Sequence, residues 1–450
     1  MKAIIMGAGN AGAVLAARLA AEKFDAVVID TDAGKLARLS ENFDVMTLEG
    51  NGADPETLAR AGIENAAILL AVTNHDEANI LACNFARNAG VRHRVARIQN
   101  PALLHGAGLA DLSVLGVDLA IAPASECAAE MAALLLSPMA LEVARLFDGL
   151  VVAAALQIPP DARHLGVPLG QYPNPGVLRD VRIIALARGG ELHIPGGETC
   201  LASGDLVAVA GAHAHINALA ADLLPGRAPI RKVVIAGGGH IGLALARLLE
   251  RADQFGTVLL ERDPAVAERC AGVLRQTLVL CGDMLSGEFL QTAGITRETA
   301  FVSTFPDNED TLIGALLARK IGASFTLGRV SKLEYLPIIR QVGLHDRAVN
   351  PYLSMNDAIL HFIRGAHAAC VSSFQTLAGE FHEVTLTTKS PLAGVPLRGA
   401  KLPRGLIVAS ILRNGGVITP CGDTVPEPGD RAAIFGLPGA ARKIAALFPF

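Results

Sequence analysis

Short runs of apolar, largely β-branched residues alternate along the chain with stretches in which apolar residues recur every three or four positions. The short runs predict strands buried on both faces, and the longer stretches predict amphipathic helices. Alternation of this kind predicts an α/β fold with a doubly wound parallel sheet and right-handed crossovers. In the first part of the chain the strand candidates are 3–6, 26–30, 45–48, 67–72 and 94–98.

The pattern changes after about residue 138. Shorter extended runs, such as 181–187 and 407–412, are separated by turn residues including Arg188-Gly189-Gly190 and Ser203-Gly204-Asp205. Glycine and aspartate at such positions favour tight turns between strands. These segments therefore predict small α+β modules.

The second half of the chain repeats landmarks of the first half in the same order. An offset that drifts by only a few residues over two hundred positions indicates a duplication. The matching pairs are Gly7 and Gly237, Asp30 and Glu261, Gly62 and Gly294, Glu77 and Glu309, Arg97 and Arg329, Pro123 and Pro351, and Asp205 and Asp430. We expect Rossmann-type domains at 1–138 and 231–369, α+β modules at 139–224 and 370–450, and a linker at 225–230.

Composition narrows the class of protein further. With 39 basic and 43 acidic residues among 450, nothing points to nucleic acid as a partner. No signal-type segment precedes the first strand candidate, and no run of about 20 apolar residues could span a membrane, so we expect a cytoplasmic protein. The seven cysteines are scattered and lack CxxC spacing, which favours reduced thiols.

Both Rossmann-type domains open with a glycine-rich turn between a strand and a helix. The first glycine permits the turn, the second lets backbone approach a pyrophosphate, and the third allows close helix packing. Unpaired N–H groups and the helix dipole then favour a phosphate anion. The candidate binding residues are Gly7, Ala8, Gly9, Asn10, Ala11 and Gly12 in the first repeat, and Gly237, Gly238, Gly239, His240, Ile241 and Gly242 in the second.

An acid ends the next predicted strand in each repeat, Asp30 in the first and Glu261 in the second. At this distance from the glycines a carboxylate can accept hydrogen bonds from ribose hydroxyls. It would repel a 2′-phosphate, so NAD(H) or an adenosine nucleotide is favoured over NADP.

Further polar residues are predicted to line the same crevice. Thr73 and Asn74 end the fourth strand candidate, and Arg97 ends the fifth, where its guanidinium could pair with phosphate. The second repeat keeps Arg329 but has Thr304-Phe305-Pro306-Asp307 near the Thr-Asn position. The ligand of the second crevice could therefore differ or be absent.

Catalytic patterns are not recognisable. No metal-ligand spacing, Cys/His nucleophile or Ser-His-Asp arrangement can be assembled, and His213 and His215 are interpreted as solvated or packing residues. His240, inside the second glycine turn, is expected to touch ligand. Nucleotide folds without a catalytic partner favour a sensor whose output is a change of shape.

Beyond these features the chain resembles a known family over nearly its whole length. The resemblance rests on MKAIIMGAGNAG, VVIDTD, LEGNGADPETLARAGI, AVTNHDEANILAC and VARIQNP in the first half, and on KVVIAGGGHIGLALARLLE and LCGDMLSGEFLQTAGI in the second. It is similar to the TrkA family, nucleotide-binding subunits of bacterial Trk potassium uptake systems built from tandem RCK (regulator of potassium conductance) units.

The resemblance implies a regulatory subunit that binds NAD(H) and ATP or ADP. It also implies assembly into a ring (a dimer or tetramer) on the cytoplasmic face of a TrkH-type potassium channel subunit, with nucleotide exchange gating potassium flow. The sequence departs from the family at Phe305-Pro306 and after Arg364-Gly365. An NAD-dependent oxidoreductase with a site between the repeats, a regulator of potassium efflux and a stand-alone nucleotide sensor remain as alternatives.

Overall fold

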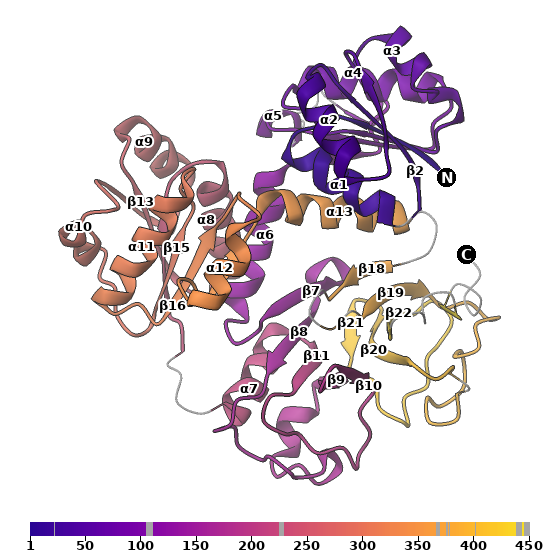
Figure 1. Cartoon of the computed structure of the whole chain (residues 1–450). Helices are drawn as coiled ribbons and strands as arrows, with labels where there is room; N and C mark the ends of the chain where they lie inside the picture. The colour runs from indigo at the N-terminus through magenta and orange to yellow at the C-terminus, as the bar shows by residue number, and fades with distance from the viewer. Residues whose placement is uncertain are drawn as a thin grey trace. The chain divides into compact units, whose positions relative to one another are not determined.

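The computed structural model describes residues 1–21, 23–104, 111–224, 229–365, 370–374, 377, 379–400, 402–437, 443 and 444 (Figure 1). They form two compact units, each built from both halves of the chain. The first unit comprises 1–131 and 231–360, and the second comprises 132–230 and 361–450. Residues 225–228 of the expected linker, and residues 366–369 just after Arg364-Gly365, lie outside the described residues.

The first unit contains a six-stranded sheet made by the first repeat, with the order β3-β2-β1-β4-β5-β6. Every neighbouring pair of strands is parallel. After β3 the chain returns to the centre of the sheet, where β4 pairs with β1, and the later strands extend the sheet on the other side. Its strands are β1 (Lys2–Met6), β2 (Asp25–Asp30), β3 (Met46–Glu49), β4 (Ile68–Ala71), β5 (His93–Arg97) and β6 (Leu119–Ile121).

Helices connect these strands and bury their apolar faces against the sheet. Asp32 and Asp54 cap α2 and α3 by accepting backbone N–H groups of the first turn, which is why these helices start where they do. The helices are α1 (Asn10–Ala21), α2 (Ala33–Asn42), α3 (Pro55–Arg60), α4 (Asp76–Asn88), α5 (Pro101–Leu104) and α6 (Pro123–Leu136), with a short 3₁₀ turn η1 (Ile63–Asn65).

The second repeat builds a matching parallel sheet in the order β14-β13-β12-β15-β16-β17. The predicted α/β class with doubly wound parallel sheets is thereby confirmed. Its elements are β12 (Lys232–Ala236), α8 (His240–Ala252), β13 (Gly256–Glu261), α9 (Pro264–Val273), β14 (Leu278–Cys281), α10 (Gly287–Thr292), β15 (Thr299–Ser303), α11 (Asn308–Ile321), β16 (Phe325–Arg329), α12 (Tyr335–Val342), β17 (Arg347–Val349) and α13 (Pro351–Gly365).

Within the first unit, α13 of the second repeat contacts helices of the first repeat. The Asn356 amide donates to the Ala11 carbonyl over 3.3 Å, and Asp357 lies 3.9 Å from the Arg18 guanidinium. The Ser354 hydroxyl donates to a carboxylate oxygen of Glu130 on α6 over 2.6 Å. The last helix of one repeat therefore packs on the first helix of the other (Figure 1).

The second unit contains two antiparallel sheets, which confirms the α+β character predicted for the small modules. Their orders are β10-β9-β11-β8-β7 and β18-β19-β22-β20-β21. The first module has β7 (Glu142–Leu146), η2 (Phe147–Gly149), β8 (Val151–Gln157), η3 (Leu169–Gln171), η4 (Pro175–Leu178), β9 (Val181–Arg188), β10 (Glu191–His193), β11 (Leu206–Gly211) and α7 (His213–Leu223). The second has β18 (Cys370–Ser373), β19 (Glu380–Thr385), β20 (Leu406–Arg413), β21 (Gly416–Ile418) and β22 (Arg431–Gly436).

The repeated Arg and Asp landmarks of the modules form the same ion pair twice. Arg188 donates through Nε and one terminal nitrogen to the two carboxylate oxygens of Asp205, each over 2.7 Å. Arg413 binds Asp430 in the same way over 2.8 Å. Both aspartates are buried, so the bidentate arginine compensates the desolvation of their charge.

The two modules share one apolar core. Phe374, Phe381 and Phe435 of the second module pack in a single cluster with Leu146 and Phe147 of the first. At its edge Glu383 accepts the Phe147 backbone N–H over 2.6 Å and pairs with Arg431, also over 2.6 Å. The duplicated modules thus fold as one body.

The cysteines with described side chains are free thiols: Cys83, Cys127, Cys200, Cys270, Cys281 and Cys421. Among the described residues, no helix combines the length and apolar character needed to cross a bilayer.

His345 is a buried polar group in the core of the second repeat. It is 4% exposed, and neither ring nitrogen makes a hydrogen bond of normal geometry with a described residue. Burial, aided by the Arg319 charge, lowers the pKa of His345 to about 4. Val117 is the residue of the first repeat that matches His345. Each directly precedes an aspartate, Asp118 or Asp346, that accepts a backbone N–H of the preceding strand. Val117 is as buried as His345, so an apolar side chain fits this position.

The depressed pKa of His345 predicts acid sensitivity. The ring stays neutral when folded but takes up a proton near pH 6.5 when unfolded, so stability is lost as pH falls from about 6.5 towards 4. The loss should approach roughly 3 kcal/mol. His345→Val should reduce the slope of this part of the profile of unfolding free energy against pH, measured by urea denaturation. An unchanged profile would contradict the assignment.

Candidate nucleotide-binding sites

The first glycine turn is held by a very close approach of α1 to the end of β1. A Cβ on Gly12 would meet the Gly7 carbonyl oxygen at 1.8 Å, and Gly7 itself has φ +109°. Both positions therefore require glycine, one for packing and one for the backbone conformation. The helix consequently starts immediately above the carboxyl edge of the sheet.

Gly9 differs from these two glycines because nothing lies within 4 Å of an added Cβ. Gly9 and Asn10 are exposed, while Ala8, Ala11 and Gly12 are buried. The exposed side of the turn thus offers the first backbone N–H groups of a 12-residue helix to the crevice. This arrangement suits a phosphate anion, because these groups have no partner within the helix.

Asp30 joins the end of β2 to the glycine turn. One carboxylate oxygen accepts the Ala8 N–H over 2.6 Å, and the other accepts the Asp32 N–H over 2.9 Å. These bonds fix the orientation of the carboxylate at the rim of the crevice. Each oxygen keeps a further lone pair with which it can accept a ribose hydroxyl.

The far side of the first crevice is organised by the buried amide of Asn79. Its oxygen accepts the Thr73 N–H and hydroxyl, and its nitrogen donates to the carbonyls of Thr73 and Arg97. The ends of β4 and β5 are therefore fixed together, and Asn74 and Arg97 are displayed at the edge. The Arg97 guanidinium donates to the Asn74 side-chain oxygen over 2.8 Å.

Arg97 is a partly buried cation that makes no ion pair with a described residue. Its Nε is buried and makes no hydrogen bond there, and its hydrogen-bonded side-chain partner is the neutral amide of Asn74. Burial lowers the pKa of Arg97, partly offset by Tyr352 and Asp76. Partial desolvation of a guanidinium that has no ion-pair partner costs free energy, so the site favours an added anion.

The second crevice repeats the loop and acid geometry. A Cβ on Gly242 would meet the Gly237 carbonyl at 1.9 Å, and Gly237 has φ +113°. Glu261 accepts the Gly238 N–H over 2.6 Å and the Asp263 N–H over 2.9 Å. A longer acid therefore makes the same two contacts as Asp30. Gly239 and His240 are exposed at the start of α8, as Gly9 and Asn10 are at α1, and Ile241 follows in its first turn.

The far side of the second crevice differs from that of the first. Phe305 is buried, Pro306 has no N–H, and the Thr304 hydroxyl donates to the Gly237 carbonyl over 3.0 Å. Arg329 donates to the carbonyls of Phe305 and Pro306 over 2.9 and 2.7 Å. The retained arginine thus already has backbone acceptors, unlike Arg97.

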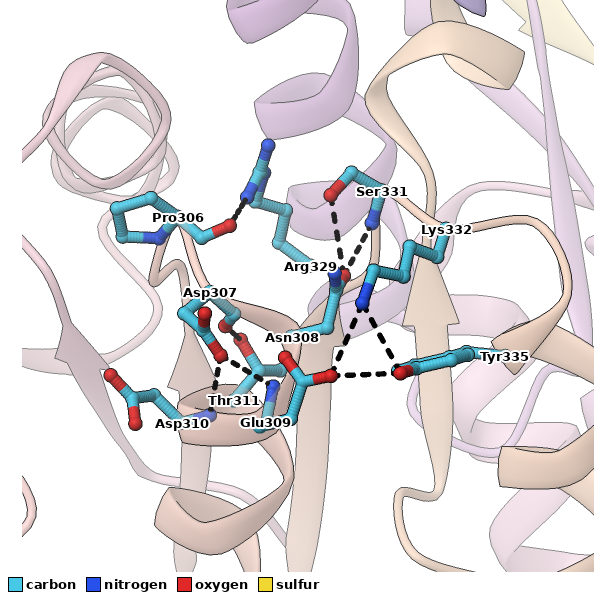
Figure 2. Close-up of polar contacts among 10 residues, drawn as sticks. All are labelled: Pro306, Asp307, Asn308, Glu309, Asp310, Thr311, Arg329, Ser331, Lys332 and Tyr335. Carbon is cyan, nitrogen blue, oxygen red and sulfur yellow. Dashed lines mark hydrogen bonds and ion pairs between the residues drawn. The ribbon is translucent and has the colours of Figure 1, made fainter.

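Lys332 and Tyr335, shortly after Arg329 in the chain, were not anticipated from the sequence, and Glu309 was noted only as a mark of duplication. The Tyr335 hydroxyl donates to Glu309 over 2.8 Å, and the Lys332 ammonium lies 3.2 Å from both that carboxylate and the hydroxyl (Figure 2). The hydrogen bond from Tyr335 and the bonds at the start of α11 lower the pKa of Glu309. Only proximity to Arg329 in sequence could have indicated Lys332 and Tyr335.

His213 and His215 both lie in the second unit, outside the two glycine turns. His213 Nδ1 is 2.7 Å from the Ser137 hydroxyl, and burial lowers the pKa of His213 to about 4. His215 is half exposed and 4.0 Å from the Asp180 carboxylate. Their surroundings are those of packing and surface groups. No cluster of three or more His, Cys, Asp or Glu able to hold a metal occurs among the described residues.

Comparison with known proteins identifies the family. The model of the TrkA-N domain matches residues 3–123 and 233–351, which contain both glycine turns. The model of the TrkA-C domain matches 154–224 and 381–448, within the two small modules. The chain belongs to the TrkA family. Its TrkA-N and TrkA-C domains alternate in tandem.

Full-length relatives support this assignment. The Trk system potassium uptake protein TrkA of Azorhizobium caulinodans is 30% identical, with 100% of this chain and 98% of that protein aligned. The TrkA protein of Halomonas elongata is 32% identical over 97% of this chain and 95% of its own length. The similarity therefore covers both repeats and indicates a regulatory subunit of potassium transport.

Solved structures share the fold. The GsuK RCK domain superposes with a TM-score of 0.60 at 20% identity, covering 99% of this chain and 94% of that one. The GsuK channel bound to NAD gives a TM-score of 0.60 at 21% identity, covering 99% of this chain and 78% of that one. At this identity the comparison shows the RCK fold alone.

The glycine geometry predicts that two substitutions in one turn affect different properties, one the nucleotide affinity and the other the stability. Gly9→Asp places a carboxylate in open space beside the N–H groups, so nucleotide affinity of the first crevice should fall at least tenfold with little change in Tm. Gly12→Ala must displace the Gly7 carbonyl and should lower Tm. Calorimetric titration and thermal unfolding check both. A stable, fully binding Gly9→Asp protein would contradict the placement of the phosphate.

Proposed function

We propose that this TrkA protein is the nucleotide-sensing regulatory subunit of a Trk-type potassium uptake system. It would bind nucleotide in both crevices, assemble as a ring and act on a TrkH-type membrane subunit from the cytoplasmic face. Family membership and the RCK fold support the potassium-transport role. The observation that carries nucleotide binding is the partly buried Arg97 guanidinium, which makes no ion pair with a described residue and ends β5 in the sheet whose β1 leads into the first glycine turn.

The ligand we favour in the first crevice is NAD(H). Asp30 is oriented by two backbone bonds to accept ribose hydroxyls, and its charge opposes a 2′-phosphate. The GsuK channel, which shares the fold, has been solved with NAD bound. The turn and acid would equally accept the adenosine diphosphate part of ATP or ADP, so these remain candidates for either crevice.

Regulation would follow from unequal affinity for two shapes of the assembly. A nucleotide shifts an equilibrium between states only as far as its binding free energies to them differ. The loop N–H groups follow β1, Asp30 ends β2 and Arg97 ends β5, so the three lie at the ends of different strands. A ligand that bridges these groups would favour the conformation in which all three can contact it at the same time.

An oxidoreductase is the second candidate, and one observation favours it. The hydroxyl of Tyr335, close to the Lys332 ammonium, is a group that could exchange a proton with a substrate at the second crevice. Turnover of NADH with a panel of carbonyl metabolites would support an enzyme. We expect none, because the proposed output is a conformational change.

Removal of the first acid should weaken nucleotide binding. Asp30→Ala deletes the ribose acceptor and frees the Ala8 N–H, so binding should weaken by about 1–3 kcal/mol. Asp32→Ala is the matched control, since this neighbouring carboxylate caps α2 and pairs with Lys35. It should lower stability slightly and leave affinity unchanged. Equal calorimetric affinities for Asp30→Ala and the parent protein would remove Asp30 from the site.

The sensor role predicts that nucleotide changes the assembly. Titration of the purified protein with NAD, NADH, ATP and ADP, followed by light scattering and small-angle X-ray scattering, should show a nucleotide-dependent change of mass or radius. Saturable binding without any such change would argue for a passive nucleotide-binding protein.

A further inference from the structure

A cavity lies between the two small modules of the second unit. It has a volume of about 190 Å³, and its lining combines Arg182 on β9 of the first module with residues of the second module. Val181 and Ile183, on either side of Arg182, pack in the core of the first module. Because neighbouring side chains of a strand point to opposite faces, Arg182 projects away from that core. The cavity is therefore a joint feature of the two modules.

Arg182 is a partly buried cation that makes no ion pair with a described residue. Its Nε is enclosed and makes no hydrogen bond there, and burial lowers the pKa of its guanidinium, partly offset by Cys421. Partial desolvation of an unpaired charge costs free energy. At the offset that matches Asp205 with Asp430, the counterpart of Arg182 is the apolar residue Ile407. The fold of the module therefore does not itself require a cation at this strand position.

Apolar side chains form part of the lining, and the second cation in it is already neutralised. Leu406 and Val408 are buried residues of β20 that contribute to the cavity. Arg398 also lines the cavity, but it forms an ion pair with Asp423. No acidic residue of the described part of the chain belongs to the lining. One positive charge, that of Arg182, is thus left uncompensated beside apolar surface.

We propose that this cavity binds a small organic monoanion, a carboxylate on a compact apolar group, with Arg182 as its counter-ion. The carboxylate pairs with the guanidinium, and the apolar group packs against Leu406 and Val408. A protein cavity of about 150 Å³ holds one benzene molecule, so a ring or branched chain of that size fits here. A nucleotide carries more negative charge than one arginine balances. The bound molecule would contact both modules and stabilise their association, independently of the glycine turns.

Cys421 lines the same cavity and is exposed, so its reactivity can report whether the cavity is occupied. The Thr424 hydroxyl accepts the Cys421 N–H over 2.9 Å and lies 3.5 Å from its sulfur. This hydroxyl, together with the Arg182 charge, lowers the pKa of the thiol. A carboxylate at Arg182 would cover the sulfur and cancel a charge that favours the thiolate. Both effects slow alkylation, because the thiolate is the nucleophile.

The test compares benzoate with its uncharged analogue benzamide on the full chain. The rate of alkylation by iodoacetamide is measured for each cysteine by mass spectrometry, at constant ionic strength and without nucleotide. Benzoate should slow alkylation of Cys421 about fivefold, and benzamide at the same concentration should have little effect. Cys281, an exposed thiol of the second Rossmann-type domain, is the internal control and should react at an unchanged rate. Equal protection by benzamide, or no protection by benzoate, overturns the proposal.

A matched pair of variants tests the counter-ion. Arg182→Leu removes the charge, keeps apolar surface and should abolish the protection of Cys421 by benzoate. Arg179→Leu changes the net charge equally at an exposed residue outside the lining, and protection should persist. Protection that survives Arg182→Leu removes Arg182 from the site. If that variant does not fold, the comparison of benzoate with benzamide on the unaltered protein still decides. Nucleotide affinity does not enter this measurement, so the monoanion site and the proposed function can fail separately.

Discussion

The contact on which the nucleotide sites depend is the approach of a helix to a backbone carbonyl. Gly12 and Gly242 bring the helix so near the turn that a methyl group would overlap the carbonyl oxygen of Gly7 or Gly237. That closeness aims the first helical N–H groups at the carboxyl edge of the sheet. The acid at the end of the neighbouring strand can then reach the turn, as Asp30 reaches Ala8. The phosphate and ribose contacts that we propose would be consequences of this packing.

Local patterns predicted the parts of the molecule that local interactions determine. Apolar runs located the strands around the first glycine turn, and the strand–helix alternation predicted the parallel sheets. The three-residue strands β6 and β17 were not predicted, because segments so short carry no periodicity. The Arg188 and Asp205 landmarks were used only as marks of duplication. The structure shows that they form a buried ion pair repeated in each module.

Long-range contacts account for what the sequence could not predict. The sequence placed Arg97 at a strand end, but its burial, its bond to Asn74 and the influence of Asp76 and Tyr352 come from other elements of the fold. Arg329 shows the same limit. It is the same residue type at the matching place, yet backbone carbonyls satisfy it because Phe305 and Pro306 replace the polar strand end. The identity of the residue alone does not show whether an arginine at this position is bonded to backbone carbonyls, as Arg329 is, or is not, as in Arg97.

The placement of α13 on α1 bears on why the two repeats are joined in one polypeptide. A chain with a single repeat and this packing would have to take that helix from a second copy, and symmetry would then pair both copies of α1 with identical helices. Fusion removes that symmetry, because each helix is encoded separately. The sequence of α13 can therefore change without altering α6, so the surroundings of the two glycine turns can diverge independently.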